Sequence, residues 1–351
     1  MDNFSDFLSK NNLLIITEVN RFYLSGFRSS LGYLFIIKGK KLLYVDGRYI
    51  EAARDGVNPD VTVRLLGKLS DAADEIKKEF GISEIITEAD ISVRESERIK
   101  QIFEDTKVRP SVELSDMLIN LRSYKTEREI EHILKAQSFA EKAFANILNF
   151  IRPGVTEREI AIELEHKMLL AGAEVMAFHT IAVSGVNTSK PHGVPTDKKV
   201  ENGDFVTMDF GAVSGGYCSD MTRTVAVGYA TDDMIEVYET VLSAQNSAIK
   251  ILKAGVSGRE ADAAARNVIE AAGYGKYFTH STGHGVGLEI HEYPNLSYLN
   301  EGKLRRGNIV TVEPGIYIEG MFGVRIEDMV KIEENGARNL TDSQKNLIII
   351  K

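Results

Sequence analysis

Residues 203–224 read GDFVTMDFGAVSGGYCSDMTRT, and residues 307–328 read GNIVTVEPGIYIEGMFGVRIED. Both stretches open with the frame Gly-x-x-Val-Thr-x-acid-x-Gly, which covers residues 203–211 in the first and 307–315 in the second. A second acid follows further along each stretch. The four acids are Asp209, Asp220, Glu313 and Glu327. This match predicts that one structural unit occurs twice and presents a pair of acids each time.

Each stretch has the pattern of an antiparallel hairpin. In residues 206–210 apolar side chains alternate with other side chains, which is typical of a strand. Turn-forming residues at 214–216 then lead into a returning strand. A turn centred there predicts that Asp209 lies roughly opposite Asp220. A turn near Gly320 predicts the same arrangement for the two acids of the second stretch.

Four carboxylates in two related hairpins need a partner of positive charge. Opposed side chains on one face of a sheet lie about 5 Å apart at their Cβ atoms. Crowded carboxylates raise one another's pKa values unless a cation neutralises them. A single pair would be interpreted as exposed acids on a solvated face, but two homologous pairs favour a shared cation site. We therefore expect metal ions.

The repeat extends upstream of both hairpins. RPGVTERE at 152–159 is echoed by KAGVSGRE at 253–260, and helical patterns precede them near 127–150 and 233–252. In each echo a Thr or Ser lies three residues before a Glu, the capping-box spacing that opens a helix. Each half of a C-terminal domain, residues 123–351, is thus expected to contain helix, glycine turn, helix and hairpin. A pseudo-twofold axis would bring the acid pairs face to face.

Composition excludes several classes of protein. The 351 residues suffice for two domains, and 42 basic against 51 acidic residues give a net charge of −9, which argues against nucleic acid as a partner. The single cysteine, Cys218, fits a reducing compartment. The N-terminal sequence lacks a signal-peptide pattern, and no apolar run approaches the ~20 residues that span a bilayer. We expect a cytoplasmic protein without a membrane partner.

Residues 1–122 have a different pattern. Strand-like runs occur at 13–17, 32–37, 42–46, 61–65 and 84–87, and helical patterns occur near 69–79 and 92–104. This order predicts a smaller N-terminal α/β domain with a mixed sheet. Because the domain contains no glycine-rich phosphate loop, we interpret it as a domain for oligomer contacts and for covering the neighbouring site.

Histidines add to the acidic set. His280, His284 and His291 lie in HSTGHGVGLEIHEYP, and His192 lies in KPHGVPT. A lone histidine is more often a core residue than a ligand, but these four lie in short glycine-flanked segments. The glycines around His284 allow close backbone approach. Four carboxylates and an imidazole suit two divalent ions, Mn²⁺ or Co²⁺ first, with Fe²⁺ or Zn²⁺ as alternatives.

The ordered motifs MDFG, SDMTRT, GHGVGLEIHE, VEPGIY and VRIED resemble those of the pita-bread metallopeptidases that cleave beside proline. These enzymes are prolidase (Xaa-Pro dipeptidase) and aminopeptidase P (Xaa-Pro aminopeptidase). The resemblance covers essentially the whole chain, and YLSGFRSSLGYLFI and LYVDGRYIEAA look like their N-terminal domain. It implies an α+β protein with a pita-bread catalytic domain after a creatinase-like N-terminal domain. It also implies a homodimer that acts on peptides with proline at the second position.

The resemblance further implies a role for each metal ligand. Asp209 would hold one metal ion, Asp220 and Glu327 would bridge both ions, and His284 and Glu313 would complete the second site.

The remaining site residues would act on the substrate. His192 and His291 match positions that bind substrate and stabilise the tetrahedral intermediate, His280 matches another residue that lines the site, and Glu313 would pass a proton to the leaving nitrogen. Two more residues follow from strand geometry, because Arg325 lies two positions before Glu327 and Tyr317 lies four beyond Glu313. The alternative for Arg325 is a salt bridge that only balances the acids.

One position departs from the pattern. Some archaeal-type prolidases have an arginine where this chain has Asn295, and that arginine is thought to hold the free carboxylate of a dipeptide. The departure favours an aminopeptidase P acting on longer peptides, with Xaa-Pro dipeptidase as the alternative. Methionine aminopeptidase commonly lacks such an N-terminal domain, creatinase uses no metal, and non-enzymatic binding relatives should have lost ligands. All five ligands are present here.

Overall fold

The computed structural model describes residues 2–351. The chain divides into two compact units, Met1–Arg122 and Ser123–Lys351. We propose that these units are the two domains expected from the sequence, and each is described by itself. Among residues 2–351 no helix combines the length and the apolar character needed to cross a membrane.

The first unit is built on a six-stranded mixed sheet with the order β4-β3-β2-β1-β5-β6. Its strands are β1 (Leu13–Ile15), β2 (Gly32–Ile37), β3 (Lys40–Val45), β4 (Val61–Leu65), β5 (Glu84–Glu88) and β6 (Lys107–Ser111). Its helices are α1 (Asp2–Lys10), α2 (Glu18–Ser25), α3 (Ile50–Gly56), α4 (Leu69–Phe80), α5 (Val93–Ile102) and α6 (Val112–Ser123), whose last residue opens the second unit. β1 pairs with β2 antiparallel and with β5 parallel. The expected mixed sheet is confirmed.

Both faces of this sheet are covered. Leu14 and Phe35 belong to a core cluster on one face, and Leu13 and Leu34 belong to a cluster on the other. Strands buried on both faces read as continuous apolar runs, which is why LLI and GYLFII were readable as strands. β6 was not predicted, because its sequence KVRPS is polar and contains a proline. Proline in a sheet is confined to edges such as this one.

The second unit repeats a motif of two helices and a hairpin. Its helices are α7 (Glu127–Ile147), α8 (Glu157–Ala171), α9 (Asp232–Ile251) and α10 (Gly258–Ala271), with short 3₁₀ turns η1 (Gly185–Ser189) and η2 (Gly275–Tyr277). The strands of the first half are β7 (Ile181–Ser184), β8 (Phe205–Phe210), β9 (Val213–Ser214), β10 (Tyr217–Cys218) and β11 (Met221–Val227). Those that follow α10 are β12 (Gly283–Gly285), β13 (Glu292–Leu296), β14 (Ile309–Val312), β15 (Gly315–Ile318), β16 (Phe322–Arg325), β17 (Asp328–Glu333), β18 (Gly336–Asn339) and β19 (Ile349–Ile350).

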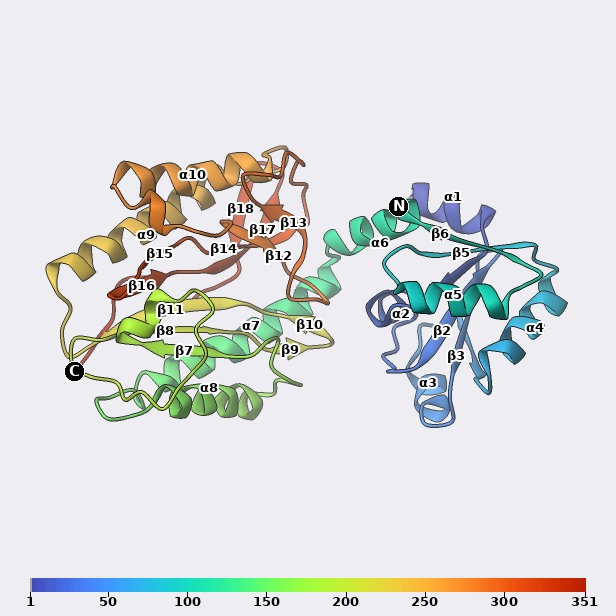
Figure 1. Ribbon diagram of the computed structural model, residues 1–351, viewed down its shortest axis with the longest axis horizontal. Coiled ribbons are helices and arrows are strands. Elements are labelled where there is room, and N and C mark those ends of the chain that lie inside the picture. The colour runs from blue at the N-terminus through green and yellow to red at the C-terminus, as the bar shows by residue number, and fades with distance from the viewer. Residues whose placement is uncertain (1) are drawn as a thin grey trace. The chain divides into compact units, whose positions relative to one another are not determined.

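The order of elements in both halves agrees with the sequence-based expectation. Figure 1 shows α9 and α10 on one side of the strands of this unit and α8 on the opposite side. Thr156 and Ser257 cap α8 and α10, and each forms a capping box with the Glu three residues on. Separate apolar clusters lie under the two helix pairs. β11 is buried along its whole length, and it contacts β16 and β17 of the second half. The two halves therefore meet at this strand.

The first hairpin has a register that differs from the expected one. β8 pairs with β11 so that Asp209 lies opposite Thr222, and the expectation that it lies opposite Asp220 is wrong. The turn consists of the two glycines at 215–216, whose φ angles are +58° and +80°. A two-residue hairpin turn of this kind requires positive φ. The strands therefore pair symmetrically about the bond between the two glycines, and Ser214 lies opposite Tyr217. Asp220 is two residues before Thr222, which makes it a diagonal neighbour of Asp209 on the same face.

The second hairpin has the expected register. β14 pairs with β17 so that Val312 lies opposite Asp328. The same register continues from β15 to β16. Glu313 follows Val312 and Glu327 precedes Asp328, so the two glutamates are set opposite one another.

Candidate metal and active site

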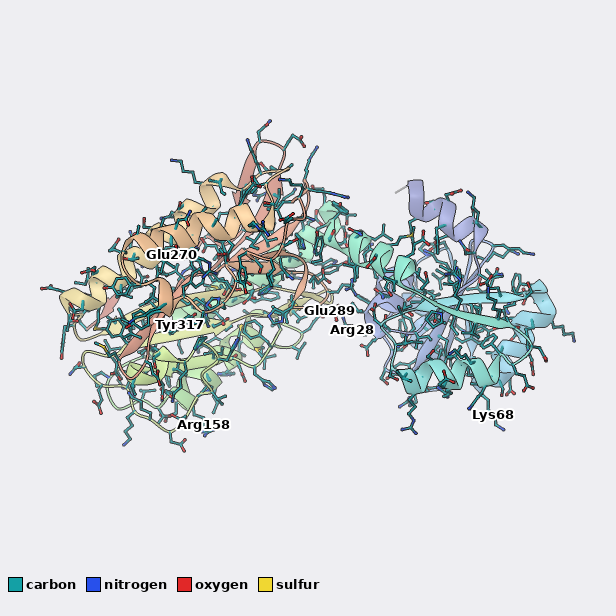
Figure 2. All side chains as sticks on the ribbon, turned by 45° about the horizontal axis from the view of Figure 1, so that its top comes forward. Arg28, Lys68, Arg158, Glu270, Glu289 and Tyr317 are labelled. Carbon is teal, nitrogen blue, oxygen red and sulfur yellow. The ribbon has the colours of Figure 1, made fainter. Side chains whose placement is uncertain are left out.

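A cavity of about 620 Å³ lies in the second unit and is lined by residues of both halves. The expected site residues that line it are His192, Asp209, Asp220, His280, His284, His291, Glu313, Arg325 and Glu327. Tyr317 contacts two of these residues through its hydroxyl. Figure 2 shows Tyr317 between the strands of the two halves, whereas Arg158 lies on the outside of the same unit.

Three of the expected ligands lie close together in the wall of the cavity. Asp220, His284 and Glu327 each offer one ligand atom, and these atoms lie within 4.8 Å of one another. Nδ1 of His284 lies 3.0 Å from the carbonyl oxygen of Gly285, so the proton on Nδ1 can be donated there. This hydrogen bond orients the ring so that Nε2 faces the carboxylates, as in metal-binding histidines.

The other two expected ligands, Glu313 and Asp209, line the same cavity. Oε1 of Glu313 lies 3.2 Å from Nε2 of His284 and accepts a hydrogen bond of 3.1 Å from Thr311. Oδ2 of Asp209 lies 2.6 Å from Nη2 of Arg325. The structure therefore brings together all five residues that the sequence proposed as ligands.

Close backbone approach around His284 depends on its glycine neighbours. A Cβ atom on Gly283 would lie 2.0 Å from the carbonyl oxygen of Thr311, and one on Gly285 would lie 2.7 Å from that of Glu292. Such distances exclude a side chain at either position. Glycine at both places lets the strand of His284 lie directly against the strands that flank it.

Crowding of the acids is visible in their pKa values. Burial, and then the negative charge of Glu327, raise the pKa of Asp220 well above its usual value. Burial, and then the charge of Glu313, do the same for Glu327, and burial also raises the pKa of Asp209. Glu313 is the exception: burial raises its pKa, but the hydrogen bond and charge of His284, together with the charges of His280 and Arg325, outweigh burial and lower the pKa to about 2. Carboxylates held together in this way favour a cation between them.

The donor set fits divalent metal ions. Within residues 2–351, Oδ1 of Asp209 and Oε1 of Glu327 are buried and accept no hydrogen bond. Buried oxygens without partners are costly unless a ligand or ion engages them. Carboxylate oxygens with one imidazole nitrogen are the donors of hard and borderline divalent ions.

A hydrogen-bonded chain runs from Asp209 to His280. Arg325 holds Asp209 through Nη2 and donates from Nη1 to the hydroxyl of Tyr317 at 2.9 Å. That hydroxyl lies 2.9 Å from Nε2 of His280, whose Nδ1 lies 2.8 Å from the carbonyl oxygen of Ser281. Burial lowers the pKa of His280, so the neutral ring can accept from Tyr317. Arg325 thus contacts one of the acids directly, a contact that both interpretations of this residue predict.

His192 lies on a loop whose two ends are fixed by one buried carboxylate. Oε1 of Glu157 accepts from the backbone nitrogen of Ser184 at 2.7 Å and from Asn187 at 3.0 Å. Its Oε2 accepts from the nitrogen and the hydroxyl of Thr196 at 3.0 and 2.6 Å. Glu157 therefore ties together the segments before and after His192.

His291 is held by the residue that follows it. The ring centroids of His291 and His284 lie 4.4 Å apart, which places His291 beside the proposed ligands. Glu292 forms a buried ion pair with Lys125, with 3.0 Å between Oε2 and Nζ. Its Oε1 accepts from the backbone nitrogen of Glu289 at 3.2 Å. The start of the second unit is thereby connected to the loop of His291.

The cavity contains residues that the sequence reasoning did not select. Phe178, Ile181 and Ile290 supply apolar surface, and His179 supplies a further imidazole. One sequence signal could have found His179, because it follows Gly172 by the same interval by which His280 follows Gly273. The apolar residues carried no comparable signal, since their side chains resemble those of any strand or loop.

Comparison with known proteins places these features in a family. The sequence profile of metallopeptidase family M24 matches residues 131–334, and that of the creatinase/prolidase N-terminal domain matches residues 10–124. The chain is similar to the Xaa-Pro dipeptidase of Pyrococcus horikoshii, with 39% identity over 348 residues that cover 98% of this chain and 97% of the relative.

Solved structures give the same result. An Xaa-Pro dipeptidase from Bacillus anthracis has a TM-score of 0.93 and 41% identity, and covers 99% of this chain and 97% of its own. An X-Pro aminopeptidase from Thermotoga maritima has a TM-score of 0.92 and 38% identity, and covers 99% of this chain and 100% of its own. These matches confirm the expected pita-bread fold of the second unit and the creatinase-like fold of the first.

Proposed function

This chain belongs to metallopeptidase family M24, and we propose that it is a metal-dependent hydrolase of the peptide bond before proline. One observation carries the proposal: four carboxylates, two of them buried and two partly buried, line one cavity with an imidazole, and two carboxylate oxygens are unpartnered among the described residues. The names of its similar relatives supply the substrate class.

Dipeptides are the first substrates we propose. The sequence favoured longer peptides because of Asn295, which lines the cavity. Similar proteins named Xaa-Pro dipeptidase nevertheless match this chain along its whole length, and they support the dipeptidase better than the aminopeptidase. An Xaa-Pro aminopeptidase is the second candidate, favoured by the match to the Thermotoga maritima protein.

Two divalent ions, Mn²⁺ or Co²⁺ first, are the proposed cofactors. Their ligands would be Asp209, Asp220, His284, Glu313 and Glu327. When bound, such ions would polarise the scissile carbonyl and lower the pKa of a water molecule toward neutrality. The family membership supports metal use, and the orphaned oxygens of Asp209 and Glu327 support these positions.

The protein's own groups would move the protons and hold the substrate. Glu313 can accept a proton at a carboxylate oxygen and return it to the leaving nitrogen. His192 and His291 line the cavity and can donate N–H groups toward the negative charge that develops on the carbonyl oxygen. Arg325 keeps Asp209 in place through a 2.6 Å contact.

Proline recognition would rest on shape more than on hydrogen bonds. A peptide bond before proline lacks the N–H group that other peptides offer. Phe178, Ile181 and Ile290 line the cavity with apolar surface, which suits a ring without a donor. We further propose a homodimer in the cytoplasm; the single cysteine, which is buried, is compatible with a reducing compartment.

Hydrolysis of three peptides tests the proposal. The purified chain is treated with a chelator, dialysed and assayed with added Mn²⁺ or Co²⁺ on Met-Pro, Met-Pro-Gly and Met-Ala-Ala. We expect cleavage of Met-Pro above all, and none without metal. Faster cleavage of Met-Pro-Gly would favour the aminopeptidase, and preference for Met-Ala-Ala or no turnover of either proline peptide would contradict the proposal.

A further inference from the structure

We propose that Asp262 and Arg266 of α10 are positioning residues that hold His280 in the place where it serves the reaction. The inference rests on the proposed function, because His280 lines the proposed active-site cavity. Neither residue of the pair is among the residues that line the cavity.

Asp262 fixes the backbone on the C-terminal side of His280. Its side chain is 1% exposed, and its Oδ1 accepts from both the nitrogen and the hydroxyl of Thr282, each at 3.0 Å. Thr282 in turn accepts at its carbonyl oxygen from the backbone nitrogen of Glu313 at 2.8 Å. Asp262 thus holds Thr282, and the carbonyl oxygen of Thr282 holds the backbone of Glu313, which is a proposed metal ligand.

Arg266 fixes the backbone of His280 itself and the segment before it. The guanidinium makes a bidentate contact with Asp262, Nε to Oδ2 at 2.8 Å and Nη2 to Oδ1 at 3.1 Å. It also donates to the carbonyl oxygens of Phe278 and His280 at 3.0 and 2.9 Å. Its Cζ lies 4.2 Å from the centroid of the Phe278 ring. The planar fork of arginine suits such multiple contacts, which lysine cannot reproduce.

We call Asp262 and Arg266 together the clamp. It binds the backbone at residues 278, 280 and 282, on both sides of the His280 side chain. Between those places the imidazole of His280 is directed to Tyr317, at 2.9 Å. The ring of Phe278 contacts the ring of His280 edge-on at 5.2 Å. A shift of residues 278–282 would move His280 away from Tyr317, and small misplacements of site groups have large kinetic effects.

The other half of the unit provides a natural comparison. Aligned on VTERE and VSGRE, α8 has Ala161 and Glu165 where α10 has Asp262 and Arg266. A helix at this place in the fold therefore packs without the pair. The histidine at the matching position of the first half is His179, which is exposed, whereas His280 is partly buried. The clamp thus occurs only in the half whose histidine is partly buried and hydrogen-bonded to Tyr317.

A double-mutant cycle separates positioning from mere stabilisation. Arg266→Met, His280→Ala and the double variant are compared with the parent enzyme in kcat, KM and melting temperature on the same proline dipeptide. We expect Arg266→Met alone to lower kcat by about 10- to 100-fold with a smaller change in KM. In the His280→Ala background the same change should cost less than about threefold, because coupled residues are not additive.

Two further variants keep the test independent of folding. Arg266→Lys preserves the charge beside Asp262 and should restore part of the lost kcat. Arg259→Met removes an exposed arginine of the same helix, which is 55% exposed and pairs with Glu301, and should leave kcat unchanged. Hydrogen exchange on the metal-free protein gives a readout without turnover, in which Arg266→Met should lower the protection of the Thr282 amide.

The outcomes distinguish this inference from the proposed function. A parent enzyme that cleaves no proline peptide would remove the proposed function. If the parent is active, equal losses from Arg266→Met with and without His280 would overturn the inference alone. A normal kcat for Arg266→Met, or for His280→Ala, would overturn it as well.

Discussion

Arg223 of the first half forms a buried ion pair with Asp328 of the second half, with 2.8 Å between Nη2 and Oδ1 and side-chain exposures of 1% and 0%. Nη1 of Arg223 also donates to the carbonyl oxygens of Thr222 and Glu327 at 3.0 and 2.6 Å. The guanidinium therefore joins β11 to the start of β17, directly beside a proposed metal ligand from the second half.

Breaking this pair should destabilise the protein strongly. Removing one partner of a buried ion pair costs about 3–5 kcal/mol. We expect Arg223→Met to lower the free energy of unfolding by about 3 kcal/mol, at the lower end of this range. The reason is that Lys345 still neutralises Asp328 in the variant. Urea unfolding followed by far-UV circular dichroism measures the change. The control is Arg158→Met, whose pair with Asp197 is 58% and 82% exposed and should contribute less than about 1 kcal/mol. Equal losses in both variants would contradict the account.

The crowded acids should stabilise the protein only when metal is present. Asp220→Asn removes a buried carboxylate beside Glu327, and we expect its melting temperature in EDTA to exceed that of the parent, because strained active-site groups cost stability. Added Mn²⁺ should raise the melting temperature of the parent by linkage, which is worth about 2.7 kcal/mol at 100 times the dissociation constant, and should leave Asp220→Asn unchanged. Asp197→Asn, an exposed acid, serves as control. If Mn²⁺ raised the melting temperature of Asp220→Asn as much as that of the parent, Asp220 would not be a metal ligand.

Acid should release the loop of His192. Burial raises the pKa of Glu157, but hydrogen bonds from Thr196, Asn187 and Ser184 outweigh it and hold the pKa below its ordinary value of 4.5. A carboxyl whose pKa is lower in the folded state contributes stability above the unfolded-state pKa, and loses it as the pH falls through the folded-state pKa. We expect Glu157→Gln to cost about 2–4 kcal/mol at neutral pH.

The pH dependence is the sharper part of that prediction. The difference in unfolding free energy between the parent and Glu157→Gln should be constant above about pH 5.5 and should shrink below pH 4.5. Urea titrations in EDTA from pH 7 to pH 3 measure it. A difference that grows on acidification would contradict a lowered pKa of Glu157 in the folded protein.

The hydroxyl of Tyr317 should matter for turnover more than for folding. Tyr317→Phe removes the group that joins Arg325 to His280, while Arg325 keeps its contacts with Asp209 and with the carbonyl oxygen of Pro191. We expect kcat to fall by about 10- to 100-fold and the melting temperature to change little. Steady-state kinetics with a proline dipeptide gives the answer, and an unchanged kcat would exclude this chain of hydrogen bonds from the reaction.

The sequence was informative wherever two independent copies of a pattern could be compared. The repeat of GDFVTMDFG in GNIVTVEPG predicted four acids in one place, and all four line one cavity. Register was predictable for the second hairpin but not for the first. There the positive φ of the glycines at 215–216 decides between two turns that differ by one residue.

Contacts between residues far apart in the chain were not predictable. Lys125 pairs with Glu292, 167 positions away, and no local pattern connects them. The same holds for Asp262 and Thr282, which meet only because α10 packs beside the segment of His280. Such partners depend on tertiary packing, and propensity and periodicity carry no information about it.

We propose that the acids of the two halves hold metal ions between them. X-ray diffraction from crystals soaked in Mn²⁺, recorded so that manganese scatters anomalously, tests it most directly. If both ions bind there, two anomalous peaks should appear among Asp209, Asp220, His284, Glu313 and Glu327. A map without a peak among these side chains, from a protein that remains active on Met-Pro, would contradict it.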